Sequence, residues 1–386
     1  MSYSFKRSAD RSLPVIMVLG LFLIDIILPG ITNLYSDKRV FRRRNFLKRL
    51  NKMADEIPFS QIHDDYDFIL FSDVLKSMPK PPYVLVYDSS NVDIVLNHIC
   101  NLQFIPNSLS RLVGVALDKN AHDSVKRAHP WFPSVVVDLE PIKKSTNNLE
   151  NGRYLGYTLA LVVHARICAS FALRGIDFWS MHQDTIWVKN FELMNVEDRF
   201  PDANMIFDTI GNELPSYKRL THWICGSTFF VRASDITYQF WRQVDSLMLT
   251  SQSPDSSVMS YLCGHPKYKC SYLPHWIISS FDYFQGPREQ SPVLIQIDAP
   301  KAPGETKMDL LRRNGFVFQH SNGTCDEKAF MRLQLSVKNA FPERIIGAVV
   351  DKKESWLQKM TYSLKELMNS DPFNGKDYLK VHYTMI

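Results

Sequence analysis

Residues 81–100, PPYVLVYDSSNVDIVLNHIC, carry the signal for a strand, a turn and a helix in that order. Two prolines precede the apolar run Tyr83–Tyr87, which we expect to form a buried β-strand. The polar residues Asp88–Asn91 follow it and supply a turn and a helix N-cap, so Val92–Cys100 is predicted to be a helix. A buried strand that leads directly into a helix is the first unit of an α/β fold.

The same pattern continues along the chain. Leu112–Leu117 is a second predicted strand, which ends before Asp118, and Ala121–Ala128 is a short predicted helix. Ser134–Val137 is a third predicted strand, and it ends before Asp138. Strands that alternate with helices in this way predict a parallel sheet, with ligands bound at the carboxyl ends of the strands.

The stretch Tyr154–Arg174 is apolar on nearly all sides. A second membrane span is one interpretation, but His164 and Arg166 near its middle would be costly in lipid. We therefore expect a buried helix that crosses over to a strand at Ile176–Ser180. Three further elements are predicted: a strand at Cys225–Val231, a helix at Ser234–Leu249 and a strand at Pro292–Ile297.

The positive charge of the chain is concentrated near its N-terminus. The 386 residues have a formal net charge of +5, and 45% of them are hydrophobic, which excludes a wholly disordered, collagenous or polytopic membrane protein. Residues 1–50 alone carry ten Lys or Arg and three Asp, a net +7, so the rest of the chain is nearly neutral at −2. A basic surface for DNA or RNA is therefore not expected, and no nucleic acid partner is predicted.

Residues 13–32, LPVIMVLGLFLIDIILPGIT, are long enough to cross a membrane as a helix, and Asp25 is their only charge. We predict a short tail at 1–12, a transmembrane signal-anchor at 13–35 and a basic stem at 36–65. The alternatives are a cleaved signal peptide, although no small-residue cleavage pattern follows, and a core helix, although basic clusters flank both ends. The heavier cluster follows the helix, and the positive-inside rule alone would leave the body in the cytosol.

Six cysteines bear on the compartment. Cys263 and Cys270 are close enough to form a small disulfide loop, whereas Cys168 is expected to be a buried thiol within the apolar helix. No CxxC pair occurs, so zinc-ribbon and thioredoxin-like sites are not indicated. Asn322-Gly323-Thr324 is a glycosylation sequon, which would be used only if the body of the protein is lumenal.

Several catalytic signatures are missing from the sequence. It contains no GxGxxG, GxxxxGK[ST], HExxH or GxSxG, so dinucleotide oxidoreductases, P-loop NTPases, zincins and typical α/β-hydrolases are not indicated. The remaining candidate is residues 175–190, GIDFWSMHQDTIWVKN, in which polar residues follow a predicted strand. Oxygen ligands at such a strand end suit a divalent cation that bridges a carboxylate to phosphate oxygens.

This segment resembles the nucleotide-diphospho-sugar transferase domain, a GT-A glycosyltransferase family. Asp184–Asn190 matches the second half of the family's Asp-x-Asp and Trp motif, whereas His182 stands at its first Asp. The resemblance extends over roughly residues 80–325 and includes three further elements. They are Trp223–Val231 with its Gly226, Pro254–Ser256 in place of an Asp-Gln pair, and Pro292–Asp298 followed by Gly304 and Lys307.

The resemblance implies a GT-A-like, Rossmann-type α/β domain over residues 66–325, with a mostly parallel sheet flanked by helices and a C-terminal helical extension over 326–386. It implies transfer of a sugar, with retention of anomeric configuration, from a nucleotide-sugar donor to a hydroxyl of a glycan or glycoprotein acceptor. A divalent metal, Mn²⁺ or Mg²⁺, would assist the transfer. The usual placement is a Golgi or other secretory-pathway membrane with a lumenal catalytic domain.

The resemblance also assigns roles to individual residues. Asp184 and Asp255 are the candidate catalytic residues. The expected metal ligands are His182, Asp184, Gln296 and Asp298, and Gln296 stands where the family has His. The donor nucleotide is expected to contact Asp88, Asp118, Gly226 and Lys307, with Lys307 at the diphosphate.

Each of these assignments has a structural alternative. Asp184 would otherwise be a turn carboxylate, His182 a packed ring and Lys307 a solvated surface cation. The strand-end residues Asp88 and Asp118 would be ordinary turn residues, and Gly226 would mark a β-bulge. Because His182 and Gln296 depart from the family's metal ligands, a second function stays open: a non-catalytic GT-A-like domain that binds a nucleotide-sugar or a protein partner.

Overall fold

The computed structural model describes residues 42–144, 152–210, 223–280, 283, 291–297 and 304–340. The chain divides into two compact units, residues 1–49 and residues 50–386. In the first unit, residues 42–49 are helical, and the predicted tail and signal-anchor lie outside the described residues. The fold and the site below belong to the second unit.

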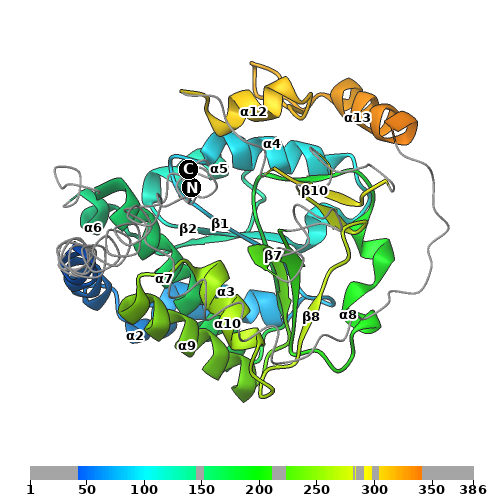
Figure 1. Cartoon of the computed structure of the whole chain (residues 1–386). Coiled ribbons are helices and arrows are strands. Elements are labelled where there is room, and N and C mark those ends of the chain that lie inside the picture. The colour runs from blue at the N-terminus through cyan, green and yellow to red at the C-terminus, as the bar shows by residue number, and fades with distance from the viewer. Residues whose placement is uncertain are drawn as a thin grey trace, which may run out of the picture. The chain divides into compact units, whose positions relative to one another are not determined.

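A mixed, mostly parallel sheet forms the centre of the second unit (Figure 1). Its order is β3-β2-β1-β4-β7-β6-β8; only β7 runs antiparallel to its neighbours β4 and β6. The strands are β1 Tyr83–Tyr87, β2 Leu112–Ala116, β3 Ser134–Val136, β4 Phe178–Met181, β6 Met205–Thr209, β7 Ile224–Val231 and β8 Cys270–Tyr272. The three strands predicted nearest the N-terminus are therefore adjacent and parallel, as expected.

Helices cover both faces of this sheet, with α4 and α5 on one face and α7 and α9 on the other (Figure 1). The helices are α2 Phe59–His63, α3 Tyr66–Lys76, α4 Val92–Gln103, α5 Lys119–Ala128, α6 Glu140–Lys144, α7 Gly152–Leu173, α8 Val196–Arg199, α9 Asp235–Ser251, α10 Asp255–Cys263, α12 Lys307–Arg313 and α13 Glu327–Ala340. The predicted helix-flanked α/β class is confirmed.

A second, three-stranded sheet was not expected from the sequence. It consists of β5 (Thr185–Trp187), β10 (Leu294–Gln296) and β9 (Ile278–Ser279), with β10 antiparallel to β5 and parallel to β9. Strand β10 lies within the predicted strand Pro292–Ile297, whereas β5 and β9, of three and two residues, are too short to show a period in the sequence. This sheet positions two residues of the site: Asp184, which precedes β5, and Gln296, the last residue of β10.

Helix α7 is the crossover helix predicted at Tyr154–Arg174. Among the described residues it is the one helix long and apolar enough to cross a membrane, and 78% of its most apolar stretch is buried in the protein. The buried Arg166 on this helix pairs with Asp245 of α9 at 3.1 Å. The ionisable residue in the middle of α7 therefore has a protein partner, and the interpretation as a buried helix is confirmed.

The compact unit begins earlier than the predicted boundary at residue 66. The Arg166 guanidinium donates hydrogen bonds to the carbonyl oxygens of Ala54, at 2.7 Å, and Ile57, at 2.6 Å. Residues 50–65 were predicted to belong to a basic stem, but Ala54, Ile57 and Ile62 are buried and the unit starts at residue 50. The sequence did not indicate this docking because backbone carbonyl oxygens, rather than side chains of the segment, bind Arg166.

Two disulfides lie in the second unit. Cys263 and Cys270 are joined, as their spacing predicted, and Cys100 on α4 is joined to Cys325, two residues before α13. Cys168 is a free buried thiol, as expected. Helix α13 begins within the predicted C-terminal extension and buries Ala329, Phe330, Leu333 and Val337 in the same core cluster as β5 and β10.

Candidate functional site

A cavity of about 450 Å³ lies at the carboxyl ends of β1, β2 and β4. Parallel strands end at the same edge of a sheet, so the residues that follow them meet there. Six of the predicted site residues line this cavity: Asp88, Asp118, His182, Gly226, Asp255 and Gln296.

The loop after β1 brings a carboxylate and an ammonium together in the cavity wall. Asp88 pairs with Lys143 of α6 at 2.5 Å and also accepts a hydrogen bond from the Ser90 backbone N–H. Burial alone would raise the pKa of Asp88, but the Lys143 ammonium and the Ser90 hydrogen bonds hold it below its usual value. Asp88 is therefore a charged, oriented group at the position expected for a donor-binding residue.

The carboxylate of Asp118 is largely used by the fold. It caps helix α5 by accepting from the Ala121 N–H at 2.7 Å, and it accepts from the backbone N–H of Ser89 at 2.7 Å and from the Ser89 hydroxyl. Asp118 thus ties the loop after β2 to the loop after β1. Its placement in the cavity wall agrees with the prediction, whereas its contacts are those of the turn-residue alternative.

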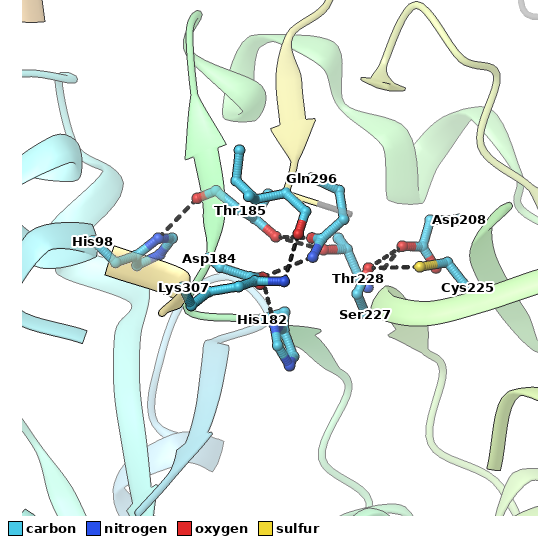
Figure 2. Close-up of polar contacts among 11 residues, drawn as sticks. His98, His182, Asp184, Thr185, Asp208, Cys225, Ser227, Thr228, Gln296 and Lys307 are labelled. Atoms are coloured by element: carbon cyan, nitrogen blue, oxygen red, sulfur yellow. Dashed lines mark hydrogen bonds and ion pairs between the residues drawn. The ribbon is translucent and has the colours of Figure 1, made fainter. Parts of the chain in front are cut away.

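Asp184 lies at the centre of a buried polar network (Figure 2). Its side chain is 1% exposed, and its carboxylate pairs with the Lys307 ammonium at 2.7 Å. It also accepts hydrogen bonds from the Gln296 amide, at 2.7 Å, and from Nδ1 of His182. Burial acts to raise the pKa of Asp184, but His182 and Lys307 together hold the pKa well below its usual range. Three predicted ligand positions therefore converge, around a lysine.

Helix α4 supports the strand that follows Asp184. His98 Nδ1 lies 2.9 Å from the Thr185 carbonyl oxygen, and Asn101 bonds both the N–H and the carbonyl oxygen of Trp187. Burial lowers the pKa of His98 to about 4, so its ring is neutral near pH 7 and Nδ1 carries the donated hydrogen. These buried polar residues of α4 were not identified from the sequence.

Gly226 in strand β7 has a backbone conformation that favours glycine, and Met259 of helix α10 packs against it. Its φ of +78° lies in the left-handed region, and a Cβ at this position would lie 2.8 Å from Cε of Met259. The buried Asp208, at the end of β6, accepts hydrogen bonds from the N–H groups of Gly226, at 3.0 Å, and Thr228, at 3.1 Å. It also accepts from the Ser227 hydroxyl (Figure 2). Asp208 was missed, although it follows the apolar run Met205–Phe207 as Asp88 follows β1.

The sequence profile of the nucleotide-diphospho-sugar transferase family matches residues 107–311, which is more than half of the chain. The chain belongs to this family. The match spans α5, α7, the Asp184 network and Gly226, and ends within α12. No curated protein sequence matches the chain.

Three solved structures illustrate the range of similar folds. WbbM, a bifunctional glycosyltransferase, is 11% identical with a TM-score of 0.39, and the match covers 69% of this chain and 52% of WbbM. Mouse xyloside xylosyltransferase 1 is 10% identical with a TM-score of 0.39 and coverage of 57% and 99%. The mannosyltransferase PcManGT from Pyrobaculum calidifontis, in complex with GDP-Man and Mn²⁺, is 10% identical with a TM-score of 0.35 and coverage of 84% and 83%. Their substrates and ions are properties of those proteins.

The surroundings of Asp184 do not fit the divalent metal that the family resemblance implies. Both carboxylate oxygens already face donors: an ammonium, an amide N–H and an imidazole nitrogen. Over the described part of the chain, no three His, Cys, Asp or Glu side chains are grouped so as to hold a metal ion. Asp298, the fourth predicted ligand, lies outside that part.

Asp255 is the first residue of helix α10, and its side chain faces the cavity. It accepts a hydrogen bond from the Ser256 N–H at 2.8 Å. Burial raises its pKa from 3.8 to about 6, against the opposing effects of the Ser256 hydrogen bond and His182. Unlike Asp88 and Asp184, this carboxylate has no ammonium or guanidinium within ion-pair distance among the described residues.

Three basic residues of the cavity wall were not identified from the sequence. Lys143 and Lys144 lie at the end of α6, and Arg153 lies in the first turn of α7. The amino end of α7 also reaches the cavity through Gly152 and Gly156. The positive end of a helix dipole and nearby cations both favour an anionic ligand. The sequence did not reveal these three basic residues as a group, because each is of a type that is common on protein surfaces.

We expect Gly226→Ala to destabilise the protein more than Gly175→Ala. Both glycines have a left-handed φ, +78° and +74°, so each substitution costs about 1–2 kcal/mol in backbone strain. At Gly226 the Cβ would also lie 2.8 Å from Cε of Met259, the movable end of a buried side chain, so we expect about 1 kcal/mol of overpacking, at the low end of the usual range. Urea unfolding of both variants measures the difference. Equal free energies of unfolding would contradict the predicted crowding between the added Cβ and Met259.

We expect Asp255→Asn to stabilise the protein near pH 7.5 and to leave stability unchanged below pH 4. The folded-state pKa of about 6 exceeds the unfolded value of 3.8, so wild-type stability falls as pH rises between these values. Allowing for screening at the cavity, the gain of the variant above pH 6 is on the order of 1–3 kcal/mol. Urea unfolding at several pH values tests this expectation. A variant that is less stable than wild type at pH 7.5 would refute it.

Proposed function

We propose that this chain transfers a sugar from a nucleotide-diphosphate sugar to a hydroxyl group of a glycan or glycoprotein. The observation that carries the proposal is the convergence of six expected positions on one cavity at the carboxyl ends of the strands. Membership of the nucleotide-diphospho-sugar transferase family supports a nucleotide-sugar donor. The cavity volume of about 450 Å³ is in the range of small-molecule sites.

The proposed donor site has a carboxylate side and a cationic side. Asp88 and the loop that Asp118 holds would contact the nucleoside, at the carboxyl ends of β1 and β2. Lys144, Arg153 and the amino end of α7 would face the diphosphate, since phosphate oxygens bind best to charged donors and helix N-termini. Gly226 would let the backbone of β7 approach the sugar. Lys307, expected at the diphosphate, is instead assigned to Asp184, with which it pairs.

In the proposed reaction an acceptor hydroxyl oxygen forms a bond to the anomeric carbon. The bond between that carbon and the diphosphate oxygen breaks, and its electron pair leaves with the diphosphate. The proton of the acceptor hydroxyl is released to a base. Asp255 is the proposed catalytic residue, because its carboxylate faces the cavity and a pKa of about 6 leaves it mostly ionised at neutral pH. Asp184 is proposed as a positioning residue, which holds the His182 ring in the cavity wall.

We further propose that the body of the protein is lumenal and anchored by residues 13–35 in a secretory-pathway membrane. Two disulfides support an oxidising compartment, since disulfides are rare in the cytosol. The sequon at Asn322 lies in an exposed turn, where its Thr324 hydroxyl donates to the Asn322 side chain at 2.7 Å. These observations favour the lumenal side over the orientation that the basic residues after the anchor would predict.

A second candidate function is binding without catalysis. The observation that favours it is the neutralised Asp184, whose carboxylate pairs with Lys307 within the fold. Such a domain would hold a nucleotide-sugar in the same cavity without transferring the sugar. Both functions include binding of the nucleotide-sugar donor, but only the first includes transfer of the sugar.

We expect calorimetry with a panel of UDP- and GDP-sugars to identify a bound donor. Arg153→Gln should weaken its affinity about 5- to 30-fold, because a charge-assisted phosphate contact is lost. Arg127→Gln, on the exposed face of α5, is the matched control and should bind as wild type does. Asp255→Asn should lower kcat about 100-fold or more with donor affinity within a few-fold. If no sugar of the panel binds, the proposed donor class is wrong; binding with no turnover selects the second candidate.

We expect secreted-pathway expression to yield a chain whose mass falls on glycosidase treatment. Asn322→Gln and Thr324→Ala should both abolish the mass change, whereas Thr324→Ser keeps the sequon and should preserve it. Electrophoresis before and after treatment is the measurement. An unmodified wild-type chain that has crossed the membrane would show that the turn at Asn322 is not used.

A further inference from the structure

We infer that Lys307 takes the place of a divalent cation beside Asp184, so that the cavity binds its nucleotide-diphosphate sugar without a metal ion. The inference rests on the proposed function for the identity of the ligand. Whether Asp184 binds a metal ion does not depend on which ligand the cavity binds.

The Lys307 ammonium is a fixed part of the fold. Its side chain is 7% exposed, and the ammonium lies 2.7 Å from Oδ2 of Asp184 and donates to the Ile297 carbonyl oxygen. Lys307 is the first residue of α12, whose start is held by a capping box between Thr306 and Asp309. The backbone that carries the lysine is therefore anchored.

The second oxygen of Asp184 is also satisfied by hydrogen-bond donors. Gln296 directs its amide nitrogen to Oδ1 of Asp184 at 2.7 Å. The Asp184 carboxylate fixes the orientation of this amide, because a carboxylate only accepts hydrogen bonds and so requires the amide nitrogen; the amide oxygen then accepts from the Thr185 hydroxyl on the neighbouring strand β5. A metal ligand would have to present the amide oxygen instead, since divalent cations bind oxygen. Turning the amide would break the hydrogen bond to Asp184 and place the amide oxygen against the carboxylate.

The charges at this point already balance. Asp184 and Lys307 together are neutral, and both are shielded from water, so their attraction is only weakly screened. A divalent cation at Asp184 would meet the ammonium at short range as well as the carboxylate. In a buried site this repulsion opposes metal binding, and removing the lysine would remove it.

The cavity has other cations for an anionic donor. Lys144 on α6 and Arg153 in the first turn of α7 line it, beside Lys143, which pairs with Asp88. Lys144 is largely exposed, with 66% of its side chain accessible, and so can reorient toward a ligand. Charge that a metal would bring to a diphosphate is thus available from the chain itself.

The first experiment titrates the purified wild-type chain with Mn²⁺ alone, followed by electron paramagnetic resonance of the free ion. We expect no stoichiometric site with a Kd below about 1 mM, a value that corresponds to weak binding. A tighter site that Asp184→Asn abolishes would overturn the inference, whatever the chain's substrate. If the donor panel described above gives a ligand, its Kd should be the same within twofold in EDTA and in 1 mM Mn²⁺. Tenfold tighter binding with Mn²⁺ would also overturn it.

The second experiment removes the internal cation. Lys307→Ala leaves the Asp184 carboxylate without its ammonium, and we expect this variant to gain Mn²⁺ binding at least tenfold tighter than wild type. Lys267→Ala, which removes a lysine on the outer surface beside Gln239, is the control and should not gain it. Lys307→Met with Asp184→Asn, which removes both charges, should also fail to bind Mn²⁺. A folded Lys307→Ala variant without any gain would refute the role of the lysine; if it does not fold, the wild-type titration decides.

If no nucleotide-sugar binds under any condition, the proposed function fails while the Mn²⁺ titration still decides the metal question. If a sugar binds only with Mn²⁺, the proposed function stands and the inference fails. The two results are therefore distinguishable.

Discussion

The structure of the site depends on one buried carboxylate. Asp184 is almost fully enclosed, and a buried charge is tolerated only when it is paired and hydrogen-bonded. Its partners come from three places: His182 after β4, Gln296 at the end of β10 and Lys307 at the start of α12. The need to compensate this charge therefore fixes how the large sheet, the small sheet and α12 meet.

Other buried polar groups are linked to Asp184 through shared hydrogen bonds. Thr185 bonds Gln296 through its hydroxyl and His98 through its carbonyl oxygen, which connects the network to α4. The same helix carries Cys100, joined to Cys325, so the segment that leads into α13 is linked to it covalently. A change at Asp184 would consequently leave several buried polar groups without partners, and such groups are expensive.

Local signals in the sequence predicted the first half of the fold well. Strand β1 has the predicted bounds, Tyr83–Tyr87, because a long apolar run between prolines and a polar turn is unambiguous. The carboxyl-end rule for parallel strands also placed Asp88 and Asp118 in the cavity wall. What each carboxylate contacts could not be predicted, since the partners Lys143 and Lys307 lie far along the chain. Of the small sheet, only the strand at Pro292–Ile297 was predicted, because β5 and β9 are short and form only through long-range pairing.

The cavity wall includes a charged group that lacks the ion pairing found in the buried network around Asp184. Asp184 is fully compensated, whereas Gly226 has a left-handed backbone and Asp255 is a carboxylate whose burial raises its pKa to about 6. The raised pKa of Asp255 opposes stability at neutral pH, and destabilised groups gather where a ligand relieves or uses them. The left-handed φ of Gly226 carries no such cost, because glycine has no Cβ. Lys307, held by α12 and Ile297, neutralises Asp184 with a positive charge that is part of the chain and already in place. The charges of Asp184 and Lys307 are thus paired within the fold. Asp255 has no cationic partner among the described residues, so its ionisation can change when a ligand binds.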